Sequence, residues 1–282
     1  MLMHEAFLIA VCTLGESLNL TRCINTLLEI SENSSENIQI AVIINNEKTD
    51  LVFDSNVKVI YEPVKGYSSV RNAAISIVPK NSNLIFIDDD EIPTSSWFEA
   101  IVDSHRKYPR DVIFGPVFSE SDSSSGFYRE NFKSKYESMP DASLVKQAGA
   151  GNMLIPSYLF EENRVAFDPF FNLSGSEDTD LCFKLRKQGV SIRYGKNAII
   201  TEIQTPERRD PKYLNARRLR DTCNYSVVIR RNSGLYGIVW RFATLTLRLA
   251  FYSVVSIFNP ELRFEQRVYL KSTQALLSGK VI

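Results

Sequence analysis

The segment LIFIDDDE, residues 84–91, decides the fold class, because it joins a short apolar run directly to four carboxylates. Residues 84–87 have the length and the β-rich composition of a buried strand. Clustered carboxylates repel one another and cost stability unless a positive charge lies among them. The segment therefore predicts a divalent-cation site at the end of a central strand, or else a solvated acidic turn that caps the next helix.

Apolar runs of similar length recur on both sides of this segment, with helical stretches between them. Strands are predicted at residues 6–12, 38–44, 57–61, 84–87 and 112–118, and helices at about 18–30, 68–78 and 95–108. Continuous apolar strands that alternate with helices indicate an α/β fold with a mostly parallel sheet covered on both faces. Such sheets bind ligands beyond the carboxyl ends of their strands, so the candidate site comprises residues 13–16, 45–47, 62–66 and 88–91.

A second acidic group opens a predicted helix in the segment GSEDTDLCFKLRKQG, residues 175–189. Ser176 is the predicted N-cap, Glu177 and Asp178 lie in the first turn, and Gly189 can end the helix. A first-turn carboxylate is kept ionised by the helix dipole, and beside a cleft it can take a proton from a hydroxyl group. The alternative is that these acidic residues only stabilise the helix.

A third segment, KGYSSVRNAA at residues 65–74, combines a glycine with a basic residue. Gly66 permits close backbone approach, and Arg71 lies one turn into the predicted helix, where it could reach a phosphate. The alternative for Arg71 is a surface salt bridge.

Composition excludes several classes of protein. The 282 residues contain 33 basic and 33 acidic side chains, so no net charge drives the chain onto nucleic acid. The charge is unevenly distributed: the formal net charge is −8 for residues 1–200 and +8 for residues 201–282. Four cysteines without CxxC spacing and two histidines, His4 and His105, argue against a zinc site, a disulfide framework or a histidine triad, and favour a reducing cytoplasm. The apolar run near the N-terminus is interpreted as a buried strand rather than a signal peptide.

Residues 206–282 are predicted to form a helical, basic extension. Its most apolar stretch, residues 237–258, is interrupted by Arg241 and Arg248, which a membrane-spanning helix would tolerate poorly. Their spacing of seven places both near one face of a helix, which favours a helix lying on an anionic membrane surface. The alternative is an apolar helix that packs on the preceding α/β part or on a second copy of the chain.

The order and spacing of these segments resemble family 2 glycosyltransferases of the GT-A fold, which use nucleotide-sugar donors. The resemblance covers about residues 6–200, and it rests on NNEKTD, KGYSSVRN, IFIDDDEIP, GAGNMLIP and GSEDTDLCFKLRKQG. The extension looks only loosely like the tails of bacterial polysaccharide-assembly members. The resemblance implies a GT-A catalytic domain over residues 1–205 and an extension over residues 206–282.

The resemblance also implies roles for individual residues. Asp178 would be the general base of an inverting transfer, with Glu177 and Asp180 as supporting acids. Asp90, together with Asp88, would hold Mn²⁺ or Mg²⁺ on the donor diphosphate. Donor contacts are implied for Thr13, Glu16, Asn45, Arg71, Asp88 and Asp89, and for Gly151 and Asn152 where donor sugar and acceptor meet.

The sequence departs from the family pattern at two places. Asn45 stands where the family usually has Asp, which weakens the preference for a uridine nucleotide although the amide oxygen can still accept a hydrogen bond. Many members place a metal-binding His after the last core strand, whereas this region reads IITEIQTP. Either Glu202 replaces that His, or the metal keeps more water and binds weakly.

The expected function is transfer of a sugar, from a UDP-sugar by preference, to a hydroxyl of a glycan or lipid-linked glycan in cell-surface polysaccharide biosynthesis. The expected location is the cytoplasm, peripheral on the inner face of the cell membrane, and a homodimer is left open. Two alternatives remain: a non-catalytic nucleotide-sugar-binding scaffold, and phosphoryl-transfer chemistry at the acidic strand end.

Overall fold

The structure is a computed structural model that describes residues 5–15, 19–47, 51–119, 136–259 and 262–281. The strands are β1 (Ala6–Thr13), β2 (Asn37–Ile44), β3 (Val57–Tyr61), β4 (Ser82–Asp88), β5 (Glu91–Pro93), β6 (Val112–Phe114), β7 (Val117–Ser119), β8 (Met153–Ile155), β9 (Ile192–Tyr194) and β10 (Ile200–Glu202). The helices are α1 (Leu20–Asn33), α2 (Tyr67–Ser76), α3 (Trp97–Lys107), α5 (Tyr158–Glu161), η1 (Pro169–Phe171), α6 (Glu177–Lys187), α7 (Pro206–Arg209), α8 (Pro211–Asn232), α9 (Leu235–Phe258) and α10 (Arg263–Ser278).

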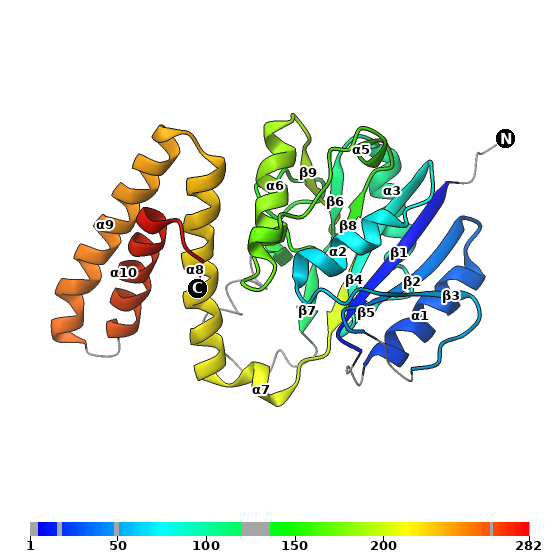
Figure 1. Cartoon of the computed structure of the whole chain (residues 1–282), viewed down its shortest axis with the longest axis horizontal. Coiled ribbons are helices and arrows are strands. Elements are labelled where there is room, and N and C mark those ends of the chain that lie inside the picture. The colour runs from blue at the N-terminus through cyan, green and yellow to red at the C-terminus, as the bar shows by residue number, and fades with distance from the viewer. Residues whose placement is uncertain (1–4, 16–18, 48–50, 120–135, 260–261, 282) are drawn as a thin grey trace.

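The main sheet has the strand order β3-β2-β1-β4-β8-β6-β9, and β5, β10 and β7 form a second, smaller sheet (Figure 1). β3, β2, β1 and β4 are parallel, whereas β8 runs antiparallel to both β4 and β6. The predicted α/β fold with a mostly parallel sheet is confirmed.

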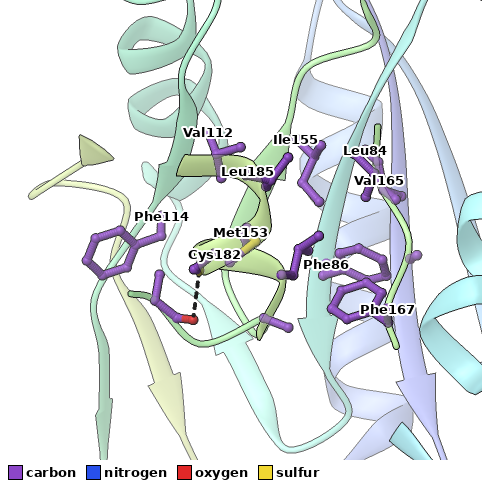
Figure 2. Close-up of a cluster of buried hydrophobic side chains, with 14 of the residues drawn as sticks. Leu84, Phe86, Val112, Phe114, Met153, Ile155, Val165, Phe167, Cys182 and Leu185 are labelled. Atoms are coloured by element: carbon purple, nitrogen blue, oxygen red, sulfur yellow. Dashed lines mark hydrogen bonds between the residues drawn. The ribbon is translucent and has the colours of Figure 1, made fainter. Parts of the chain in front are cut away.

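Helices cover both faces of this sheet, as the continuous apolar strands predicted. Side chains alternate along β1, so that Leu8 and Ala10 join the core under α2 and α6, while Phe7 and Ile9 join the core under α1 and α3. Figure 2 shows the first of these two clusters, in which the rings of Phe86 and Phe167 meet edge to face 5.7 Å apart. Each large side chain buried in this way contributes about 1.5–3 kcal/mol to folding.

The prediction of a single strand over residues 112–118 is wrong. The segment divides at Gly115 and Pro116 into β6, in the main sheet, and β7, in the small sheet. Pro116 has no N–H group to donate to a strand ladder, and Gly115 allows the backbone to pass close to the backbone oxygen of Ala198. This division carries the chain from the central sheet into the sheet that holds Glu202.

The C-terminal extension forms three long helices beyond α6, with α9 farthest from the main sheet (Figure 1). α8 packs on the part of the chain before residue 205 through a buried cluster that contains Phe171, Cys223, Val227, Val228 and Ala275. The predicted boundary after residue 205 stays a prediction, but α8 shares a hydrophobic core with the chain on the other side of it.

Candidate active site

Polar residues from three strand ends meet at one edge of the main sheet. Thr13 ends β1, Asn45 directly follows β2, and Asp88 ends β4. β1 pairs in parallel with both neighbours, which sets Thr13 beside Ile44 and Cys12 beside Asp88. The sequence predicted a ligand site at this edge, and the structure brings these predicted residues together there.

Arg71 links the two acidic segments. Its side chain is only 8% exposed, and its Nη1 and Nη2 atoms form ion pairs with Glu177 Oε1 and with Asp88 Oδ1, the latter at 3.2 Å. Taking a guanidinium out of water costs several kcal/mol, so a buried arginine needs such carboxylate partners. Arg71 therefore fixes the end of β4 against the start of α6, although Glu177 lies 106 residues further along the chain.

The turn before α6 is fastened to the start of α2. The Tyr67 N–H donates to the backbone oxygen of Asn172 at 2.8 Å, and the Ser69 N–H donates to Asn172 Oδ1 at 2.9 Å. Gly66, at φ +139°, makes this approach possible, because a Cβ there would collide with the Asn172 side chain and lie 2.5 Å from its backbone oxygen. The close approach predicted for Gly66 is thus to Asn172, and it lets Arg71 reach α6.

Glu177 and Asp178 are adjacent but have different surroundings. Glu177 is buried, and burial raises its pKa to about 7 against the opposing charge of Arg71. Asp178 is half-buried, and burial raises its pKa, while Arg71 and the Thr179 N–H, 2.5 Å from Asp178 Oδ1, oppose the change. Glu177 is engaged by Arg71, so Asp178 is the carboxylate of this pair that a substrate can reach.

The carboxylates of residues 88–91 have different partners. Asp89 accepts a hydrogen bond from the Thr13 hydroxyl, and Glu91 Oε2 accepts one from the Asp88 N–H at 2.9 Å. Burial raises the pKa of Asp89 and raises that of Glu91 well above its usual range. The Asp88 side chain is 40% exposed, compared with 14% for the Asp90 side chain, so Asp88 is open to a ligand.

Asp90 and Glu202 converge on the guanidinium of Arg208. Arg208 Nη1 forms an ion pair with Asp90 Oδ2 and lies 3.3 Å from Glu202 Oε1. Glu202 reaches this point because β10 pairs antiparallel with β5, which sets Glu202 opposite Glu91. Burial raises the pKa of Asp90 to about 7 although Arg208 opposes it.

These two carboxylates fit a hard divalent cation, since both offer oxygen ligands to a point that already attracts a positive charge. Among the described residues, no three His, Cys, Asp or Glu side chains gather as a metal-binding group. Asp90 and Glu202 would therefore supply only part of a metal site, and the oxygens of a bound diphosphate would have to complete it.

Asn45 and Thr13 have internal partners that sequence reasoning did not foresee. Asn45 Nδ2 donates to the backbone oxygens of Glu62 and Val64 at 3.0 and 2.8 Å, and its Oδ1 accepts from the Gly66 N–H at 2.7 Å. An aspartate could not donate the first two bonds, which explains why an amide stands here. The amide holds the loop before α2 rather than being reserved for a nucleotide base.

Asn152 differs most from expectation. It is fully buried, its Oδ1 accepts from Trp97 Nε1 at 2.8 Å, and its Nδ2 donates to the backbone oxygens of Pro116 and Ala198 at 3.1 and 2.7 Å. Its side chain therefore cannot line a donor pocket, contrary to the sequence expectation. Gly151 does lie at the site, because a Cβ on it would collide with the Glu91 carboxylate.

Two other predicted residues lie elsewhere. Glu16 falls outside the described residues. Asp180, expected to be a supporting acid, is fully buried and accepts from Asn232 Nδ2 at 2.6 Å, while Lys184 Nζ lies 2.7 Å from its other oxygen. Asp180 thus contacts the extension rather than the cleft.

Sequence reasoning missed Arg208 and Asn172. The excess of basic residues after residue 200 hinted that the extension would meet the acidic part, but no spacing singled out Arg208. Asn172 carries no chemical signature, and its role depends on a contact with Gly66 across about a hundred residues.

A family model, that of glycosyl transferase family 2, matches residues 8–157, which is more than half of the chain. The protein therefore belongs to glycosyl transferase family 2 and is a glycosyltransferase of the GT-A fold. Among solved structures it is similar to S. aureus TarS, residues 1–349, in complex with UDP-GlcNAc, at 16% identity and a TM-score of 0.58, over 83% of this chain and 67% of that one. At this identity the likeness shows the fold alone. No curated protein matches the chain.

Proposed function

We propose that this glycosyltransferase moves a sugar from a UDP-sugar to a hydroxyl group of a glycan or lipid-linked glycan acceptor, with inversion at the anomeric carbon. We further propose that the reaction belongs to cell-surface polysaccharide biosynthesis. Family membership supports the nucleotide-sugar donor, and the complex of TarS with UDP-GlcNAc supports uridine as the base.

The observation that carries the proposal is the ion-pair bridge from Asp88 through Arg71 to Glu177. This bridge holds the Asp88 carboxylate, at the sheet edge proposed to bind the nucleotide, close to Glu177. Glu177 is the residue directly before Asp178. A one-step displacement needs the donor and the base to be held in one geometry, because misplacement by about 1 Å can cost a hundredfold in rate.

Asp178 acts as the general base. Its position in the first turn of α6, with the Thr179 N–H on one oxygen, favours the ionised form, while burial weakens its hydration and makes it a better proton acceptor. The residue takes the proton of the acceptor hydroxyl as the oxygen attacks the anomeric carbon. Glu177 does not share this role, because Arg71 engages it.

Asp88 would contact the nucleotide, and Asp90 and Glu202 would hold Mn²⁺ or Mg²⁺ when the donor is bound. The cation supplies positive charge to the diphosphate that leaves. Without a cation, Arg208 pairs with both carboxylates, so Arg208 has to move away from Asp90 before a metal can take its place.

Binding and turnover test the proposal separately. The full chain is mixed with UDP, GDP, ADP and a panel of UDP-sugars, with and without Mn²⁺, and its melting temperature and the release of UDP are recorded. We expect UDP with Mn²⁺ to stabilise the chain and at least one UDP-sugar to be turned over, with inverted product. Equal melting curves with every nucleotide, together with no turnover, would contradict the proposal.

A further inference from the structure

The α9 helix exposes an apolar face that no described part of the chain covers. Only 6% of its most apolar window is buried, and by length and composition it is the one helix among the described residues that could cross a membrane. We define the outer face of α9 as its exposed apolar residues at helical spacing, which are Tyr236, Val239, Trp240, Leu247, Phe251, Val254, Ile257 and Phe258. At 3.6 residues per turn, these fall within about one third of the helix circumference.

The two arginines of α9 lie beside this face rather than on it. Arg241 donates to Ser226 Oγ at 3.1 Å and stacks on the ring of Tyr225, 4.9 Å from its centre. Arg248 donates to the hydroxyl of Tyr269 at 3.2 Å. These contacts are to α8 and α10, so neither guanidinium lies on the outer face, which carries no charge.

The exposed charged residues of α9 and of its neighbour α10 are all basic. In the described α9 and α10, the exposed charged residues are Arg248, Arg263, Arg267 and Lys271. The last three recur every fourth residue and form one ridge along α10. Glu265, which could offset them, is instead ion-paired with Arg218 of α8.

An uncharged face about 35 Å long, on a pair of packed helices whose exposed charges are all basic, matches an anionic lipid surface. A spanning orientation would draw α8 and α10, which pack against α9 and carry many charges, into the hydrocarbon. A symmetric contact with a second copy would set equivalent surfaces against each other, including their basic residues. Anionic headgroups would neutralise that charge instead.

We propose that the outer face of α9 lies in the plane of an anionic phospholipid bilayer, with Arg248, Arg263, Arg267 and Lys271 at the headgroups. This gives the enzyme a peripheral position from which it can act on an acceptor held in the same membrane. Lipid binding of this kind does not depend on sugar transfer, so the two proposals fail separately.

Co-sedimentation of the full chain with vesicles tests this surface. The vesicles are pure phosphatidylcholine, or phosphatidylcholine with about 30% phosphatidylglycerol, at low and high salt. We expect the chain to bind the anionic vesicles at low salt. Binding should be weaker to the neutral vesicles, and it should be weaker to both kinds of vesicle at high salt. Val254→Glu should reduce binding at least tenfold, whereas Val52→Glu, the same change at an exposed valine of the catalytic part, should leave it unchanged.

The basic ridge has its own matched pair of variants. Arg267→Gln with Lys271→Gln should weaken binding to anionic vesicles several-fold and reduce its salt dependence, and Arg22→Gln with Lys58→Gln should not. Melting temperatures equal to that of the wild type confirm that each variant is folded. Absence of vesicle binding by the wild-type chain, or equal losses in both members of a pair, overturns the proposal. A dimer in light scattering that Val254→Glu dissociates, without vesicle binding, would instead assign the face to a second copy.

Discussion

At the scale of single residues, the site depends on the buried guanidinium of Arg71, which pairs with carboxylates from two distant segments. Arg71 has two carboxylate partners, and its Nε atom has no hydrogen-bond partner within the described structure. The carboxylates raise the pKa of Arg71 although burial opposes them. A guanidinium held in this way is a positioning group, because both of its charged contacts are to side chains of the protein itself, Glu177 and Asp88.

Substitutions at 177 and 178 should separate the two roles. Asp178→Asn removes the proton acceptor and keeps the shape, so kcat should fall by roughly a hundredfold to ten-thousandfold while UDP binding is retained. Glu177→Gln leaves Arg71 with one ion pair, and the free energy of unfolding should fall by about 3 kcal/mol. Kinetics, UDP titration and urea unfolding measure these effects. Loss of UDP binding in Asp178→Asn at full stability would contradict the assignment of the base.

His105 gives a prediction that does not involve the site. Burial, with a smaller effect of Arg106, lowers its pKa to about 4 from 6.5, although Glu5 Oε1 lies 3.8 Å from its Nε2. The unfolded chain gains a proton near pH 6.5 and the folded chain does so only near pH 4. Stability therefore falls as the pH drops through this window, by up to ~3 kcal/mol from this residue.

Urea unfolding at several pH values, for the wild type and His105→Gln, isolates this contribution. The variant should lose less stability than the wild type between pH 6.5 and pH 4. Parallel pH profiles for the two proteins would show that His105 is not held neutral by the fold.

At the scale of elements, the sequence predicted the strands and helices better than their junctions. The apolar runs located β1, β2, β3 and β4 to within about two residues, because burial on both faces leaves a continuous signal. The break between β6 and β7, and the contact of Asn172 with the start of α2, follow from packing between distant segments. Asn152 illustrates this limit, since the family resemblance implied a ligand role and its three buried hydrogen bonds assign it to the core.

Asn152→Gly tests that assignment. Glycine accepts φ +60° without strain, so the change removes only the side-chain bonds to Trp97, Pro116 and Ala198. The free energy of unfolding should fall by about 3 kcal/mol. Asn163→Gly, at an exposed residue with φ +51°, is the matched control and should be nearly neutral. A stable Asn152→Gly protein that has lost donor binding would restore the ligand role.

At the scale of the whole molecule, the extension and the catalytic part depend on each other. Asn224 of α8 is fully buried and donates to the backbone oxygen of Ser174 at 3.0 Å, two residues before the turn into α6. Asn232, at the end of α8, donates to Asp180 within α6. α8 thus supports the helix whose first turn carries Glu177 and Asp178.

A chain that ends at residue 205 should therefore be much less stable than the full chain and should not turn over donor. The physical reason is that it would expose Phe171 and lose both asparagine contacts. Asn224→Ala in the full chain keeps the hydrophobic contacts and should lower kcat more than UDP affinity, because it disturbs the position of Asp178. Full activity and stability of the shortened chain would show that the two parts are independent.

A crystal structure of the full chain with UDP and Mn²⁺ tests the central claim most directly. The account predicts UDP at the edge formed by the ends of β1, β2 and β4, against Asp88, with an anomalous manganese peak between Asp90 and Glu202 and with Arg208 moved away. UDP bound elsewhere, or an edge without ligand in which Arg208 still pairs with Asp90 at saturating UDP and Mn²⁺, would contradict it.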